Sequence, residues 1–195
     1  MKTPSVSRFR KGFTLIELLV VIAIIAVLAA AGFAGGTAAL NKARKVSAQA
    51  AATSVATAID QFYTEYSSLP TGAETPPMAT NSAAGVRILN ILAGIETAPI
   101  ENERKVRFLS LKEAKSGNRD GVVYNTGTPP QITGMFDPWG LPYYIVMDAN
   151  YDERLAISPG NSIPAVNLNG RRAAVYSLGV KNTGDANAST LVKTW

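Results

Sequence analysis

The sequence predicts an α+β fold in which a long N-terminal helix, transmembrane in its first half, packs against a small antiparallel β-sheet. Three observations predict this fold. No formally charged side chain occurs between Leu18 and Asn41. An amphipathic helical pattern continues from there to Tyr66, and short strand-like segments separated by turn residues occupy 136–195.

The apolar run is long enough to cross a membrane. A helix rises about 1.5 Å per residue, so Leu18 to Asn41 exceeds the ~30 Å thickness of a hydrocarbon core. Glu17 is an exception at its start, because a carboxylate in the apolar core costs roughly 2.5–3.5 kcal/mol and such a residue usually has a partner or a function. Four cations with no acid among them precede Glu17 and the run, which predicts a cytoplasmic N-terminus: Lys2, Arg8, Arg10 and Lys11.

Residues 12–18 read Gly-Phe-Thr-Leu-Ile-Glu-Leu. Together with the basic residues before it and the apolar run after it, this segment resembles the prepilin signature of type IV pilins and type II secretion pseudopilins. The resemblance implies that a prepilin peptidase cuts between Gly12 and Phe13 and then methylates the new amine of Phe13. It also implies that Glu17 neutralises the N-terminal amine of a neighbouring subunit, since a buried carboxylate is tolerable when an opposite charge reaches it. Before assembly we expect Glu17 to be poorly paired.

An ordinary secretory signal peptide is the alternative for the N-terminus. Residues 29–31 (Ala-Ala-Ala) and 33–34 (Phe-Ala) could form a small-residue cleavage region. The apolar run is, however, longer than the usual 7–15 residues of such peptides and it begins beside Glu17. These features favour a retained helix.

Composition argues against catalysis and against nucleic-acid binding. The 195 residues fit one domain plus an anchor. The net charge is +5, but the four leader cations account for four of these charges and leave +1, so we expect no nucleic-acid partner. The chain has no Cys and no His, which removes disulfides, thiol chemistry and the commonest general base. We expect no enzyme, no catalytic residue and no cofactor.

The helix is expected to run from about Phe13 to Tyr66. Its membrane half contains Gly32, Gly35 and Gly36, which either soften the helix or let neighbouring helices approach closely. Beyond Asn41 an apolar stripe at helical spacing predicts a face that packs on the exported domain: Val55, Ile59, Phe62 and Tyr66.

The helix should stop before Pro70, which cannot continue it. Residues 71–135 are expected to be a variable connection. Within it, Val86–Ile95 has the pattern of a short helix, Phe108–Leu111 fits either a helix or an edge strand, and 117–121 is a turn cluster.

Two C-terminal stretches and the last residue resemble major pseudopilins of type II secretion. Residues 137–144 read Asp-Pro-Trp-Gly-Leu-Pro-Tyr-Tyr, residues 176–179 read Tyr-Ser-Leu-Gly, and the chain ends at Trp195. Asp137 is expected to start a turn and Gly140 to adopt an unusual backbone angle, with an aromatic anchor and a following strand at Tyr143–Met147.

The oxygen-bearing side chains Asp148, Asn150 and Asp152 match the opening of a calcium loop, but Glu153 and Pro159 replace its glycine and bidentate glutamate. They are weak metal candidates. A polar hairpin turn between Tyr143–Met147 and Arg154–Ile157 is the simpler interpretation. In the resembling family a loop after the second stretch binds calcium through Asp residues. Here residues 180–182 are Val-Lys-Asn, and Asp185 remains nearby.

The sequence therefore predicts three segments: a cytoplasmic leader (1–12), a transmembrane and assembly helix (13–41), and an exported domain (42–195) with a helical spine (42–66), the variable connection and a sheet (136–195). The resemblance implies a filament subunit of the bacterial inner membrane. Its partners would be prepilin peptidase, other copies, minor pseudopilins, the inner-membrane assembly platform and membrane lipid. A type II secretion pseudopilin is favoured. The alternatives are a surface type IV pilin and a membrane-anchored exported binding module.

Overall fold

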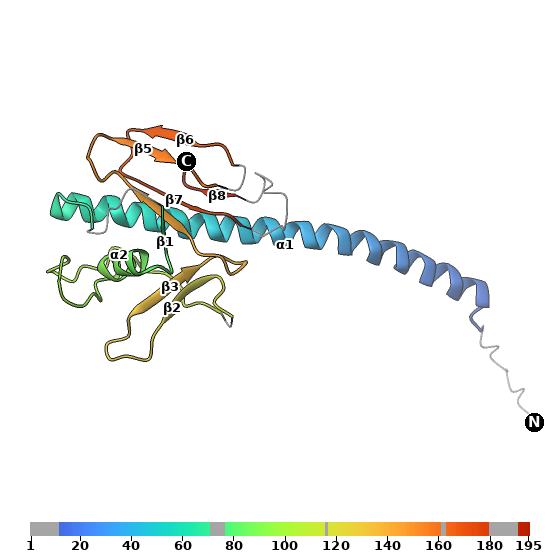
Figure 1. The fold of residues 1–195 in the computed structure, drawn as a ribbon. Helices are drawn as coiled ribbons and strands as arrows, with labels where there is room; N and C mark the ends of the chain where they lie inside the picture. The colour runs from blue at the N-terminus through green and yellow to red at the C-terminus, as the bar shows by residue number, and fades with distance from the viewer. Residues whose placement is uncertain (1–11, 71–76, 116, 161–162, 180–190) are drawn as a thin grey trace, which may run out of the picture. The chain divides into compact units, whose positions relative to one another are not determined.

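A computed structural model describes residues 12–70, 77–115, 117–160, 163–179 and 191–195. The chain divides into two compact units, Met1–Lys42 and Ala43–Trp195. Helix α1 (Leu15–Tyr66) contributes to both units and is continuous through Gly32, Gly35 and Gly36. The expected long helix is confirmed, and the structure is α+β (Figure 1).

The second half of α1 forms the spine of the globular unit. Its buried positions recur at helical spacing, and alanines among them let other elements approach the backbone: Ala48, Ala52, Val55, Ala58, Ile59 and Phe62. Tyr66 is half-buried and donates a hydrogen bond from its hydroxyl to Asn102 Oδ1 (2.9 Å). The helix ends there, and Ser67 takes a positive φ of 55° just before Pro70.

A four-stranded antiparallel sheet packs on this spine. Its order is β1 (Met78–Ala79), β4 (Tyr144–Met147), β7 (Ala173–Ser177) and β8 (Val192–Lys193). Side chains alternate between its two faces, as the pleat requires. One face joins the core that contains the buried residues of α1, and the other joins a second core beneath the hairpin of β5 (Arg154–Ile157) and β6 (Val166–Asn169). Both faces of the sheet are therefore covered.

The predicted hairpin between β4 and β5 is wrong. Residues 148–153 do connect the two strands, but β5 pairs with β6 (Leu155 opposite Leu168). Strand β4 has other partners: β7 pairs with all four of its residues, and β1 pairs with Tyr144 and Ile145 on the other edge. The chain after β4 consequently forms a separate two-stranded layer.

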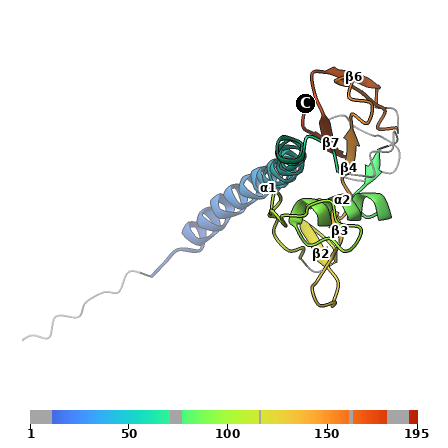
Figure 2. The same ribbon diagram turned by 90° about the vertical axis from the view of Figure 1, so that its left-hand side faces the viewer.

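The connection at 71–135 has more regular structure than the sequence analysis expects. The predicted short helix is present as α2 (Ala83–Ala93), with Ser82 as N-cap and Gly94 as a left-handed C-cap. Strands β2 (Gly121–Tyr124) and β3 (Ile132–Phe136) form a hairpin near α2 (Figure 2). Phe108–Leu111 is neither helix nor strand; the backbone N–H groups of Phe108 and Leu109 both bond to the carbonyl of Leu92.

Candidate functional site: the N-terminal signature and the Asp137 turn

The bond between Gly12 and Phe13 lies in exposed, non-helical backbone just before α1. Phe13 is 80% exposed, and a Cβ built at Gly12 would meet no atom within 4 Å. Nothing in the described fold therefore requires a glycine at position 12. A requirement for glycine there would come from an enzyme that binds this segment. The four leader cations lie outside the described residues.

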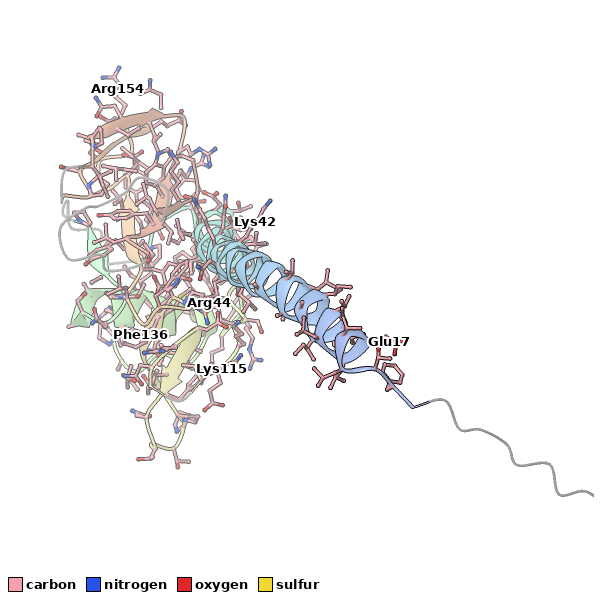
Figure 3. The ribbon with its side chains drawn as sticks, turned by 90° about the vertical axis from the view of Figure 1, so that its right-hand side faces the viewer. Glu17, Lys42, Arg44, Lys115, Phe136 and Arg154 are labelled. Carbon is pink, nitrogen blue, oxygen red and sulfur yellow. The ribbon has the colours of Figure 1, made fainter. Side chains whose placement is uncertain are left out.

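Thr14 and Glu17 form a reciprocal cap at the start of α1. The Thr14 backbone N–H and hydroxyl each donate to Glu17 Oε2 at 2.8 Å, and the Glu17 N–H donates to Thr14 Oγ1 (3.3 Å). This is a capping box, in which N-cap and N3 side chains satisfy backbone donors that the first helical turn leaves unpaired. Figure 3 shows Glu17 at that end of the helix.

The sequence analysis missed this cap, although a Thr followed three residues later by Glu is its usual signature. The expectation that Glu17 lacks a charged partner before assembly stays a prediction, although its carboxylate is hydrogen-bonded to Thr14. Both bonds end on Oε2, and Oε1 makes no hydrogen bond to any residue that the structure describes.

The first turns of α1 expose apolar side chains on all sides. Every residue from 12 to 30 is exposed, including Leu15 (82%), Ile16 (70%) and Val27 (69%). Burying a side chain of this size is worth about 1.5–3 kcal/mol, so this surface would gain stability from a cover that the described residues do not supply. Among the described residues, no helix is both long and apolar enough to cross a membrane.

The Asp137 turn is built around one buried carboxylate. Asp137 Oδ1 accepts hydrogen bonds from the backbone N–H groups of Trp139 and Leu141, both at 2.9 Å, while Oδ2 accepts from the Ser177 hydroxyl (2.5 Å). Gly140 has φ 90°, as expected, and Trp139 packs against the main core. Burial raises the pKa of Asp137, against the opposing effect of these hydrogen bonds. The turn therefore has a structural role, since its carboxylate connects the turn's own backbone to Ser177.

The C-terminal stretches singled out in the sequence meet in an aromatic cluster. The ring of Tyr144 stacks on that of Tyr176, with centroids 5.1 Å apart, and Trp195 contacts Tyr176 edge-on at 6.1 Å. Tyr176 is 2% exposed, and burial raises its pKa to about 12. These three residues come from β4, β7 and the chain end, so they hold the C-terminal layers together.

Asp148 and Asp152, two of the weak metal candidates, accept hydrogen bonds from the backbone of a turn. Asp148 is 2% exposed, and its two carboxylate oxygens accept the backbone N–H groups of Asp152 (3.2 Å) and Glu153 (2.7 Å). Asp152 Oδ1 accepts the N–H of Arg154 (3.0 Å). Oxygens engaged in this way fit a turn and do not fit a calcium site. Within the described parts of the chain, no three metal-ligating side chains gather around a common point. Residues 180–182 and Asp185 lie outside the described residues.

The comparisons with known proteins concern the N-terminus. Residues 7–33 match the prokaryotic N-terminal methylation motif. No curated protein and no solved structure matches the chain.

The chain thus carries a prepilin-type signature, of the kind found in pilin-like subunits in general. Such a signature is typical of membrane-anchored, exported subunits that prepilin peptidase processes and that assemble into filaments. The match covers Gly12, Phe13 and Glu17, and it ends within α1. It does not separate pseudopilins from surface pilins.

Proposed function

We propose that this chain is a non-enzymatic structural subunit of a pilus-like filament, and specifically a pseudopilin of a type II secretion system that helps to drive protein export. The observation that carries the proposal is the methylation motif over residues 7–33, which continues into a helix whose apolar side chains the described parts of the chain leave exposed. A subunit with this surface gains stability when other helices cover it.

Maturation begins at the exposed Gly12–Phe13 bond. Prepilin peptidase removes residues 1–12 and methylates the new amine of Phe13. Because the bond precedes the first helical residue, Leu15, the backbone is open to the enzyme without unwinding of α1. The capping box at Thr14 and Glu17 preserves the helix start after the leader has left.

The subunit is held in the inner membrane before assembly. Residues 13–41 form the anchor, with the leader in the cytoplasm and residues 42–195 exported. Lipid covers the apolar side chains first, and the helices of neighbouring copies replace it in the filament. Assembly depends on minor pseudopilins and on the inner-membrane assembly platform with its cytoplasmic ATPase.

Glu17 sets the register of assembly. Its Oε1 is available for the methylated Phe13 amine of a neighbouring copy, while Oε2 stays on Thr14. A carboxylate among apolar helices is strongly unfavourable when alone, and an opposite charge within hydrogen-bonding distance relieves most of that cost. Only the docking position that brings the two charges together is therefore favourable.

The pseudopilin interpretation is supported by the C-terminal half. The stretches that resemble major pseudopilins, 137–144 and 176–179, are joined by the hydrogen bond between Asp137 and Ser177 and by the aromatic cluster that includes Trp195. A surface type IV pilin remains the second candidate, because the methylation motif occurs in both classes.

Intact-mass and N-terminal analysis of the membrane-extracted protein, from cells that contain a prepilin peptidase, tests the proposal. The expected mature chain begins at methylated Phe13. A chain that starts at Met1, or one cut near Ala34, would contradict pilin-type processing and the assembly mechanism. Crosslinking between copies would then distinguish a filament subunit from a membrane-anchored binding module. Loss of secretion without loss of surface pili on deletion would distinguish a pseudopilin from a surface pilin.

A further inference from the structure

A basic patch lies on the globular unit beside the Asp137 turn: the Asp120 N–H donates to the Asp137 carbonyl (2.9 Å), and the Arg119 side chain lies next to Gly140. It consists of two cations on α1 and three on the segment between α2 and β2: Arg44, Lys45, Lys112, Lys115 and Arg119. Within residues 44–45 and 112–120, which carry these cations, the acidic residues are Glu113 and Asp120. Cations therefore outnumber acids by five to two on this surface.

Direct contacts hold the segment against the helix. Lys112 Nζ lies 2.5 Å from Asp120 Oδ2 and 3.4 Å from Ser47 Oγ, and the Ser47 hydroxyl donates to Asp120 Oδ1 (3.2 Å). Lys115 and Arg119 pair through their backbones in an antiparallel bridge, which places these two cations side by side at the base of a turn. Ser47, the residue of α1 that contacts Lys112 and Asp120, lies one helical turn beyond Arg44.

The charge of the patch is not neutralised internally. Asp120 balances Lys112, but Arg44, Lys115 and Arg119 are exposed and make no ion pair with any residue the structure describes. Figure 3 labels Arg44 and Lys115, and it shows Arg154 at a distant end of the globular unit, so the patch is a local feature. Glu113 is the exposed acid of the patch, so the three cations without an ion pair outnumber it by three to one.

We propose that this patch binds the anionic headgroups of phospholipids on the side of the membrane where the globular unit emerges. The proposal rests on the membrane anchoring proposed above. Arg44 follows the last residue of the apolar run, Asn41, by three positions, or about 4.5 Å along a helix, which is headgroup depth. Arginine binds phosphate oxygens through two parallel hydrogen bonds, and each cation near an anionic surface raises the ratio of bound to unbound protein about fivefold.

Lipid is favoured over an acidic protein surface because of this position in the chain. Every anchored copy would hold its patch beside the headgroups, whereas a protein partner would have to be recruited. Headgroup binding would orient the globular unit on the membrane surface until assembly lifts the subunit away.

A single-cysteine probe can test the proposal in the full chain, since the natural sequence has no Cys. Ser110 is exposed and lies two residues before Lys112, so Ser110→Cys can carry a fluorophore beside the patch. The protein is reconstituted in vesicles of phosphatidylcholine with or without phosphatidylglycerol, and quenching by headgroup nitroxides reports contact. The test variant carries Arg44→Gln, Lys115→Gln and Arg119→Gln. The control variant has the same change in charge at other exposed cations: Lys105→Gln, Arg107→Gln and Arg154→Gln.

The expected result is strong quenching that requires phosphatidylglycerol, weakens at high salt, and survives in the control variant. In the test variant the ratio of docked to undocked protein should fall on the order of a hundredfold, from about fivefold for each cation. Equal quenching of test variant and parent, or quenching independent of phosphatidylglycerol, would overturn the proposal. So would a test variant that keeps its quenching but loses crosslinking between copies, which would assign the patch to a protein partner.

Resistance to alkaline extraction is measured on the same vesicles. Extraction of every variant would mean that the anchor itself fails, and with it the proposed function and this inference. Retention of every variant, with no difference in quenching, would leave the anchor intact and reject the lipid contact alone.

Discussion

The Ser177 hydroxyl donates a 2.5 Å hydrogen bond to the Asp137 carboxylate, and both residues are fully buried although forty positions separate them. This bond joins the turn before β4 to the end of β7. The same carboxylate fixes the backbone of its own turn through Trp139 and Leu141. Asp137 therefore connects the two sequence motifs, 137–144 and 176–179, in the folded chain.

Asp137→Ala should destabilise the globular unit by about 2–4 kcal/mol, because it leaves two backbone N–H groups and the Ser177 hydroxyl without their acceptor. Asp137→Asn should cost less than about 1 kcal/mol, since an amide can accept from both N–H groups and donate to Ser177 Oγ. Urea unfolding of the full chain in mild detergent, followed by tryptophan fluorescence, measures both. Equal losses in the two variants would argue that the hydrogen bonds are not what matters at this position.

The pH dependence of stability should show the raised pKa of Asp137. In the unfolded chain this carboxyl ionises near its ordinary value of 3.8, whereas in the folded chain burial delays ionisation to higher pH. Between those two values the unfolded state releases the proton first, so the contribution of Asp137 to stability is complete below the unfolded pKa. It is lost as pH rises through the folded pKa.

The difference in unfolding free energy between Asp137→Asn and the parent isolates this effect from other carboxylates. Relative to the parent, Asp137→Asn should become more stable as pH rises from about 3 toward neutrality. A difference that stays constant, or moves the other way, would show that the hydrogen bonds outweigh burial at Asp137.

We expect Asn90 to contribute as much to the stability of the connection at 71–135 as Asp137 contributes at its turn. It is 5% exposed; its side-chain amide donates to the Ile132 carbonyl (2.9 Å) and its oxygen accepts the Ile132 N–H (2.8 Å), so it replaces a neighbouring strand for β3. Asn90→Ala should cost about 2–4 kcal/mol, because both backbone groups lose their partner. Asn90→Asp, nearly the same in shape, should be destabilising at neutral pH and partly recover in acid, when the carboxyl can donate again. Stability of Asn90→Asp that does not depend on pH would contradict this role.

Glu17→Val should leave cleavage largely intact but impair assembly or N-methylation. Glu17→Gln separates two contributions, because glutamine preserves the capping box with Thr14 and removes the charge. If pairing with the neighbouring amine drives assembly, both variants should form few filaments and yield normal mature mass. Normal assembly by Glu17→Gln would assign the residue to helix capping, and normal assembly by Glu17→Val would remove any assembly role.

Gly12→Asp should block processing without affecting the fold. A side chain at this position meets nothing within 4 Å, so the unfolding free energy should match that of the parent. Mass spectrometry should find only the chain with its leader attached. Gly12→Ala is the matched control, a smaller change that should be processed better than Gly12→Asp. Normally trimmed Gly12→Asp would count against the leader interpretation.

Local patterns in the sequence predict the elements that depend on local interactions. The apolar run, the stripe at Val55, Ile59 and Phe62, and the stop before Pro70 together predict α1, which the structure has at Leu15–Tyr66. The short helix near Val86–Ile95 and the strand at Tyr143–Met147 are also found, within a few residues. The capping box is equally a local feature of the sequence, since Thr14 is followed three residues later by Glu17.

Pairing between distant segments was decided by the tertiary structure. The sequence favours a hairpin between β4 and β5, because strands close in sequence usually pair, yet β7 takes the edge of β4 along its whole length. Likewise nothing local predicts that Asn90 serves as a strand partner for Ile132, or that Ser177 reaches Asp137. The sequence by itself determined the N-terminal signature and the long helix, since both depend on residues within a few turns of one another. The sheet order, the hydrogen bond between Asp137 and Ser177 and the basic patch depend on burial and hydrogen bonding across tens of residues, so only the folded chain decided them.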